Sequence, residues 1–151
     1  MKTITIIGAG MMGSALAFPA AENGNAVRLV GTPLDREIIE TCKKTGRHLK
    51  FTKDFPAGVS YYQIEELDAA MDGADFIICG VSSFGVDWFK DEILPRLPEY
   101  IPVISVTKGL MDTPEGQLLT YVDLWQAKLD ELGKQIPLCA IGGPCTSYEL
   151  V

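Results

Sequence analysis

Three glycines near the start of the chain have a spacing that could bind phosphate groups. Gly8, Gly10 and Gly13 form a G-x-G-x-x-G pattern directly after an apolar run and directly before a segment of helical period. In this context the first glycine allows a tight turn, the second lets backbone approach a pyrophosphate, and the third lets a helix pack closely on a strand. The first free N–H groups of that helix would face the phosphates. The pattern predicts a dinucleotide site, and a glycine-rich turn without a ligand is the alternative.

The end of the second expected strand, residues 26–30, is where such a fold selects its dinucleotide. An acidic residue there would bind the ribose 2′-hydroxyl of NAD and repel the 2′-phosphate of NADP. The chain has Gly31 and Thr32 instead, and Arg36 follows closely. We therefore expect Thr32 and Arg36 to contact the cofactor, with NADP(H) favoured over NAD(H). Thr32 could also serve as the N-cap of the next helix, which would begin at Pro33.

A third candidate position follows the apolar run 75–81, which is typical of a central parallel strand buried on both faces. Ser82 comes directly after it, and open α/β sheets bind ligands at the carboxyl ends of their strands. We expect Ser82 to contact the cofactor. Phe84 is either a second contact or, with Trp88 and Phe89, part of a buried helical stripe.

Alternating strands and helices must position these residues. The strands are expected at 4–7, 26–30, 59–63, 75–81, 102–106 and 137–141, and the helices between them at 11–23, 33–45, 65–71, 84–94 and 114–132. Six strands alternating with helices predict a single α/β domain. Its fold is a Rossmann-type doubly wound parallel sheet with strand order 3-2-1-4-5-6 and a ligand crevice at the switch point.

Three segments carry more specific expectations. The first helix should bury Met12, Ala15, Leu16 and Pro19, and the last should begin with Thr113 as its cap and bury Leu118, Val122, Trp125, Leu129 and Leu132. The basic segment 46–58, which contains the chain's only histidine, His48, is expected to be a solvated loop, with a contact to the adenosine phosphate as the alternative.

Composition limits the classes of partner. Thirteen basic and twenty acidic residues give a net charge of −7, which argues against nucleic acid and anionic membranes but not against a phosphate ligand in a local pocket. The four cysteines lack a C-x-x-C pair and partner histidines, so no metal site or disulfide is expected and a cytoplasmic location fits best. No apolar stretch reaches the length of a membrane span.

Two further motifs reveal a family resemblance. Ser105-Val-Thr-Lys-Gly-Leu110 ends the fifth strand, and Gly143-Pro-Cys-Thr-Ser-Tyr-Glu149 follows the sixth. With the opening glycine turn, they make residues 4–151 resemble the N-terminal domain of the NAD(P)-dependent sn-glycerol-3-phosphate dehydrogenases. Those enzymes interconvert dihydroxyacetone phosphate and glycerol 3-phosphate.

The resemblance assigns roles by position. It implies dinucleotide contacts from Met11, Met12 and Thr32, and contacts to both cofactor and phosphorylated substrate from Lys108. It also implies that Gly143 and Cys145 line the substrate and that Ser147 lies near the nicotinamide. A cation at the end of a central strand suits this chemistry, because it can hold a phosphate ester or a developing alkoxide; a solvated lysine is the alternative.

The chain also departs from the family. Cys145 stands where the family usually has Ser or Thr, and Thr146 and Ser147 replace its usual Phe-Ala, so a hydroxyl contact becomes a weaker thiol contact. The family takes its general acid/base lysine from a helical second domain, which we expect beyond Val151. We expect residues 1–145 to form the NAD(P)-binding domain and residues 146–151, with a capping-box spacing, to begin a helix toward that second domain.

The sequence thus predicts the cofactor-binding domain of a glycerol-3-phosphate dehydrogenase. It is expected to be inactive alone for lack of the proton donor. The expected partners are the dinucleotide, the phosphorylated substrate and the protein's own C-terminal domain. Whether a second copy of the chain joins them in a homodimer is left open. The alternatives are an NADP-dependent reductase of another small carbonyl compound, of ketoacid or deazaflavin-linked type, and a non-catalytic dinucleotide sensor.

Overall fold

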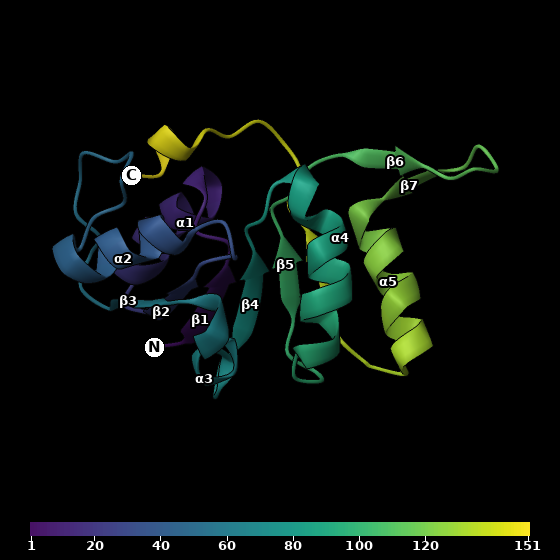
Figure 1. Ribbon diagram of the computed structural model, residues 1–151, viewed down its shortest axis with the longest axis horizontal. Helices are drawn as coiled ribbons and strands as arrows, with labels where there is room; N and C mark the ends of the chain where they lie inside the picture. Colours follow the sequence, from purple (N-terminus) through teal and green to yellow (C-terminus); the bar gives the residue numbers. More distant parts are fainter.

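Six parallel strands form one sheet in the computed structural model, which describes residues 1–151 (Figure 1). The strands are β1 (Thr3–Ile7), β2 (Ala26–Val30), β3 (Val59–Tyr62), β4 (Phe76–Cys79), β5 (Val103–Ser105) and β8 (Leu138–Ala140). Their order across the sheet is β3-β2-β1-β4-β5-β8, and every neighbouring pair is parallel. The predicted Rossmann-type α/β fold is confirmed. The switch point, where such sheets bind ligands, lies between β1 and β4.

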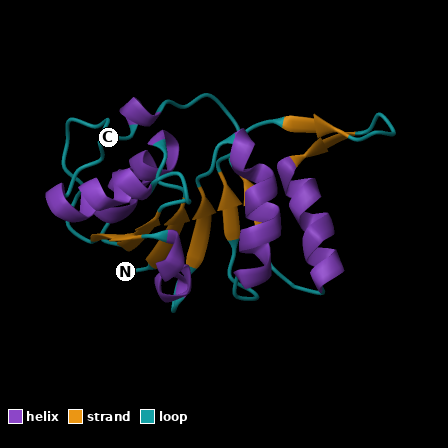
Figure 2. Cartoon of the chain, in the orientation of Figure 1, coloured by secondary structure: helices purple, strands orange, loops and turns teal.

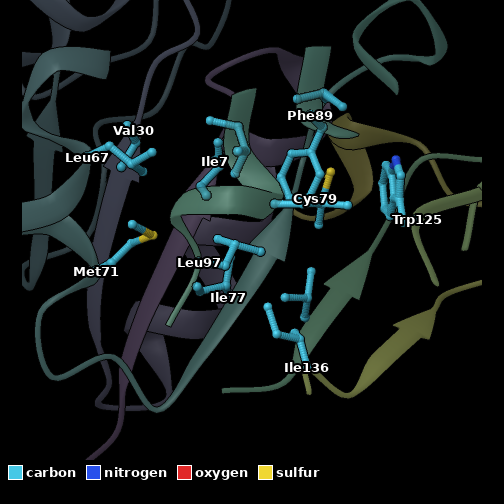
Figure 3. Close-up of a cluster of buried hydrophobic side chains, with 14 of the residues drawn as sticks. Ile7, Val30, Leu67, Met71, Ile77, Cys79, Phe89, Leu97, Trp125 and Ile136 are labelled. Carbon is cyan, nitrogen blue, oxygen red and sulfur yellow. The ribbon is translucent and has the colours of Figure 1, made fainter. Parts of the chain in front are cut away.

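Helices cover both faces of this sheet, which explains why its central strands β1 and β4 are mostly apolar (Figure 2). One face carries α1 (Met11–Glu22) and α2 (Arg36–Thr45). The other carries α3 (Leu67–Met71), α4 (Val86–Trp88) with its π-helical and 3₁₀ continuation to Arg96, and α5 (Tyr121–Leu132). Successive residues of β1 alternate between the two cores, with Ile6 in the first and Ile7 in the second. Figure 3 shows the second core, in which Trp125 packs on Phe89 at a centroid distance of 4.8 Å.

The buried face of α1 differs from the prediction. Ala15 is buried as expected, but the main stripe consists of Ser14, Ala17, Phe18 and Ala21 rather than Met12, Leu16 and Pro19. The helix is rich in small apolar residues, so two faces fit the helical period equally well. Gly13 packs directly against Gly8, and this contact sets which face of α1 turns toward the sheet.

The segment before α5 was predicted wrongly as helix. It forms an antiparallel hairpin of β6 (Leu110–Asp112) and β7 (Leu118–Thr120), which projects away from the main sheet (Figure 2). Thr113 begins a β-turn, closed by the 2.9 Å hydrogen bond from Gly116 N–H to Thr113 O. Proline at the second position and glycine at the fourth are also the signature of such a turn. The Thr-Pro pair therefore marks a turn here and not a helix start.

Helix α5 begins seven residues later than expected, because Thr120 rather than Thr113 caps it. The Thr120 hydroxyl accepts a hydrogen bond from Asp123 N–H at 3.1 Å, and the Asp123 carboxylate accepts one from Thr120 N–H at 2.8 Å. Trp125 and Leu129 are buried as predicted. Leu118 and Leu132 are exposed, which corrects the ends of the predicted stripe.

The segment 46–58 is an irregular loop, but it is not simply solvated. Phe51 and Phe55 are buried and pack on Phe18 of α1, with ring centroids 5.8 Å and 4.9 Å away. His48 is also buried, with only 2% of its surface exposed. The basic residues of the loop face solvent while its aromatic residues extend the first core, so charge alone was a poor guide to this segment.

The last residues cross the carboxyl edge of the sheet and return to α1 (yellow in Figure 1). They end in a 3₁₀ turn, Ser147–Glu149, whose Tyr148 ring lies 6.5 Å from that of Phe51. The Glu149 carboxylate accepts a hydrogen bond from Thr146 N–H at 2.9 Å, which lowers the pKa of Glu149. The capping-box spacing is therefore real, although the element it starts is a single 3₁₀ turn in this chain. None of the helices combines the length and apolarity that crossing a bilayer requires.

Candidate functional site: two cavities at the carboxyl edge

A cavity of about 390 Å³ opens at the carboxyl ends of β1, β2 and β4, beside the switch point. This is the place where the fold predicts a ligand. Its walls come from the glycine turn, the turn after β2 and the loop after β4. The lining residues are Gly8, Gly10, Thr32, Pro33, Leu34, Asp35, Gly80, Val81, Ser82, Phe84, Gly85 and Trp88.

The structure places the three glycines in three different surroundings. Gly8 turns the chain out of β1 with φ of +112°, and a Cβ there would lie 2.8 Å from the carbonyl carbon of Gly80. A Cβ on Gly13 would lie 2.1 Å from Gly8 O, so glycine is what allows α1 to pack against the turn. Gly10 is different, because a Cβ there would meet no atom within 4 Å. The space beside Gly10 is open toward the cavity.

The amino end of α1 offers free donors to that space. Gly10 is the N-cap residue of the helix, and its N–H has no acceptor within the chain. No acidic residue stands in the first turn of α1, so the helix dipole there is uncompensated. Open space, a free N–H and a helix amino terminus fit a pyrophosphate group.

The turn after β2 contains a carboxylate that the sequence argument missed. The acid is absent at Gly31 and Thr32, but the Asp35 side chain folds back into the cavity wall. Its Oδ2 accepts hydrogen bonds from Thr32 N–H and Thr32 Oγ1–H, each at 2.8 Å. Thr32 is not the cap of α2: Asp35 occupies the N-cap position and the helix begins at Arg36, three residues later than expected.

Of the other predicted cofactor residues, only one lines the cavity. Ser82 lines the wall and is exposed. Arg36 does not line it, because its guanidinium pairs with Glu65 at the surface. Met11 and Met12 are partly buried at the start of α1, and neither lines the cavity.

Two large apolar side chains at the cavity mouth are almost fully exposed. Leu34 is 93% exposed and Phe84 is 97% exposed. Phe84 is therefore not part of a buried stripe, since the core face of α4 and its continuation begins at Val86 and continues with Phe89 and Ile93. An exposed phenylalanine and leucine at the rim offer an apolar surface to a planar ring such as a base.

A second cavity of about 320 Å³ lies beside the first, at the ends of β5 and β8. Lys108 and Gly143 both line it, and the Lys108 ammonium donates a hydrogen bond to Gly143 O. The Thr107 hydroxyl donates to Val81 O at 2.7 Å and so joins the loop after β5 to the wall of the first cavity. The structure thus brings Lys108 and Gly143 together at one cavity.

The remaining predicted residues lie outside both cavities. Cys145 is exposed, and its thiol contacts Thr146 O at 3.7 Å. Ser147 is largely buried in the 3₁₀ turn that packs on α1. Two other cysteines are buried: burial raises the pKa of Cys42 to about 11 and that of Cys79 to about 12, so both are protonated core thiols.

Comparison with known proteins agrees with this geometry. Residues 3–151 match the family model described as the N-terminus of NAD-dependent glycerol-3-phosphate dehydrogenase. The chain belongs to this family. It is 33% identical over 147 residues to the NADP(+)-dependent glycerol-3-phosphate dehydrogenase of Archaeoglobus fulgidus, an alignment that covers 97% of this chain and 42% of that protein.

Other glycerol-3-phosphate dehydrogenases give the same result. The chain is 33% identical over 148 residues to the NAD(P)+ enzyme of Escherichia fergusonii, covering 98% of this chain and 41% of the relative. The crystal structure of glycerol-3-phosphate dehydrogenase from Coxiella burnetii superposes with a TM-score of 0.77 at 26% identity, covering 99% of this chain and 43% of that one. The chain therefore spans less than half the length of the family members that it matches.

His48 is a buried titratable residue whose two ring nitrogens both have hydrogen-bond partners. Its Nδ1 accepts a hydrogen bond from Lys50 N–H at 3.1 Å, and its Nε2 lies 3.1 Å from Ala9 O, so the neutral Nε2–H tautomer satisfies both contacts. Burial lowers the pKa of His48; the bond to Ala9 and the Asp35 charge oppose this shift, and the Lys50 charge adds to it. A protonated ring would place a second N–H against the Lys50 amide.

We expect acidification to destabilise the protein through His48. Because its folded-state pKa is below the value of about 6.5 in an unfolded chain, the unfolded state binds more protons in mildly acidic solution. Stability should therefore fall as the pH drops through and below about 6.5. Urea unfolding between pH 8 and pH 5 should show a steeper loss for the wild type than for His48→Gln, since the carboxylates titrate in both. Parallel pH profiles would contradict this role.

Proposed function

We propose that this chain is the dinucleotide-binding half of a glycerol-3-phosphate dehydrogenase. The enzyme would transfer hydride reversibly between NAD(P)H and dihydroxyacetone phosphate to give sn-glycerol 3-phosphate. The observation that carries the proposal is the pair of adjoining cavities, one beside the free Gly10 amide and one beside Lys108. The first suits a pyrophosphate, and the second offers a cation to a phosphorylated three-carbon substrate.

Each part of the chain would have a defined task in this reaction. The dinucleotide, when bound, supplies or accepts the hydride. The glycine turn and the start of α1, with Met11, Met12 and Ser82, would hold its phosphates and ribose. The Lys108 ammonium would bind the substrate phosphate or stabilise negative charge on the carbonyl oxygen, and Gly143, Cys145 and Ser147 would border the substrate and nicotinamide.

We propose that the proton for the carbonyl oxygen comes from a group outside these cavities. The cavities contain no histidine, Asp35 accepts three hydrogen bonds, and Lys108 is assigned to the substrate phosphate or the carbonyl oxygen. We place the general acid/base lysine in a second, C-terminal domain that would follow residues 146–151, in keeping with the 42% of the Archaeoglobus relative that this chain covers. The same proposal includes a cytoplasmic location, and it is compatible with a homodimer.

This division of labour predicts binding without turnover. Isothermal titration of residues 1–151 with NADPH should give saturable 1:1 binding, whereas reduction of dihydroxyacetone phosphate by NADPH should be slower than in an intact relative by about 10²-fold or more. Losing a positioned general acid costs about 10²- to 10⁴-fold in rate. A rate equal to that of an intact relative would contradict the assignment of the proton donor to a second domain. Activity on a 2-ketoacid instead would favour a different reductase.

For the cofactor, we propose that NADP(H) binds more tightly than NAD(H). No acid stands at the end of β2, and the Asp35 carboxylate is turned toward Thr32. Arg36 is held only by a solvent-exposed ion pair with Glu65, which is worth little and can be exchanged for a 2′-phosphate. The name of the Archaeoglobus relative includes NADP(+), which supports the same choice.

The preference for NADP(H) can be measured directly as a ratio of dissociation constants. Dissociation constants for NADPH and NADH should differ in favour of NADPH, and Arg36→Ala should reduce the NADPH affinity by about tenfold while leaving NADH nearly unchanged. Lys43→Ala, which removes another cation of α2 that also pairs with a glutamate, Glu66, is the matched control. Tighter binding of NADH by the wild type would contradict the proposal.

A further inference from the structure

The peptide groups on either side of Ala9 are held from three directions. Ala9 lies between Gly8 and Gly10 in the glycine turn and is fully buried. Its N–H donates to Asp35 Oδ2 at 3.1 Å. Its carbonyl oxygen accepts from Ser14 Oγ at 3.0 Å and from His48 Nε2 at 3.1 Å. The three side chains come from three separate segments: the turn after β2, helix α1 and the loop 46–58.

These bonds use polar groups that the proposed reaction leaves without a role. His48 and Ser14 are buried, and each makes its side-chain hydrogen bond to the same carbonyl. Burying a histidine costs free energy unless its ring nitrogens are bonded, and here both are. The Asp35 carboxylate is a net electrostatic disadvantage beside an anion site unless it serves another purpose.

Peptide planarity links these bonds to the ligand site. Ala9 O and Gly10 N–H belong to one trans peptide, so they point in opposite directions. Holding Ala9 O toward Ser14 and His48 in the interior therefore turns Gly10 N–H away from the interior, where it has no acceptor within the chain and where Gly10 lines the first cavity. A flip of this peptide would present an oxygen to the ligand instead of a donor.

We propose that Asp35, His48 and Ser14 are positioning residues that lock the Ala9 peptide groups so that Gly10 N–H faces the dinucleotide pyrophosphate. The inference rests on the proposed dinucleotide site and extends it to residues outside the glycine motif. Asp35 also bonds Thr32, so one carboxylate fixes both the glycine turn and the turn after β2. Preorganised donors need no rearrangement when the ligand arrives, which is why their loss weakens binding.

Asp35 gives a test in which its charge and its positioning role predict opposite changes in NADPH affinity. Asp35→Ala removes a negative charge near an anionic ligand, so electrostatics alone predicts tighter NADPH binding. The positioning role predicts weaker binding, by about tenfold, because Ala9 N–H and Thr32 lose their acceptor. Asp35→Asn keeps an acceptor oxygen and should bind within about threefold of the wild type or more tightly. Tighter binding by Asp35→Ala would overturn the proposal.

His48 gives an independent test with its own conservative variant. In His48→Gln the side-chain N–H can still reach Ala9 O, whereas His48→Leu keeps the bulk but has no donor. We expect His48→Leu to raise the NADPH dissociation constant about tenfold and His48→Gln to raise it by less than about threefold. Equal affinities for His48→Leu and wild type would overturn the role of His48.

The controls separate this inference from the proposed function and from simple unfolding. If the wild type itself binds no dinucleotide, the proposed function fails; if it binds and the variants bind equally well, only the positioning role fails. Binding is measured well below each variant's unfolding midpoint in urea. In ¹H–¹⁵N spectra of the folded variants, Ala9 and Gly10 amide shifts should move in Asp35→Ala and His48→Leu, and unchanged shifts would contradict the lock. Asp130→Ala, which removes an exposed carboxylate from α5, should change neither affinity nor these shifts.

Discussion

Replacing Gly13 by alanine is expected to destabilise the fold by about 3 kcal/mol or more and to abolish dinucleotide binding. The added Cβ would lie 2.1 Å from Gly8 O and 3.2 Å from Gly8 C, both of them backbone atoms that cannot move aside alone. Alanine is favoured over glycine inside a helix by about 1 kcal/mol, which is smaller than the cost of this overlap. Urea unfolding followed by circular dichroism measures the change.

Gly10→Ala is the matched control, because the same methyl group meets no protein atom within 4 Å. Its backbone φ of −68° suits any residue, so stability should change by less than about 1 kcal/mol. The methyl group projects into the proposed pyrophosphate space, so NADPH affinity should fall by at least about tenfold. Wild-type stability in Gly13→Ala, or wild-type affinity in Gly10→Ala, would contradict the assigned roles.

Lys108→Met is expected to have the largest effect on catalysis. In a complete dehydrogenase that carries this domain, turnover of dihydroxyacetone phosphate should fall by about 10²- to 10³-fold, the usual cost of removing one group that stabilises developing charge. The NADPH dissociation constant should change much less, because the glycine turn would hold the pyrophosphate. Steady-state kinetics with both substrates varied separates the two effects.

Lys134→Met is the control for that experiment. Lys134 also donates to backbone carbonyl groups, those of Pro95 and Leu97, but it lies just before β8 at the opposite edge of the sheet. Its substitution should alter stability and leave the kinetic constants of the folded enzyme unchanged. Equal losses of turnover in the two variants would show that Lys108 acts through structure alone.

The sequence predicts the sheet well because its strands carry two independent signals. Each is a short apolar run, and each is separated from the next by a segment long enough for a crossover helix, which leaves one reasonable topology. The glycine turn is equally clear, since Gly8 and Gly13 are required by backbone contacts within a local unit of strand, turn and helix. Local steric requirements of this kind are visible in the order of residues.

The errors occur where local signals are ambiguous or contacts are distant in sequence. Thr113-Pro114 fits both a helix start and a β-turn, and only the pairing of β6 with β7 decides between them. Phe84 has the period of a buried stripe, but the helix begins after it. Asp35 and His48 reach Ala9 from 26 and 39 residues away, and no spacing rule links such positions.

Titration of residues 1–151 with NADPH, followed by the amide shifts of Gly10 and of the first turn of α1, tests the central claim most directly. Saturable 1:1 binding that shifts these amides and is weakened at least about tenfold by Gly10→Ala is the predicted result. Absence of binding, or binding that leaves the Gly10 amide unshifted and is unaffected by Gly10→Ala, would show that the cavity beside the glycine turn is not a dinucleotide site.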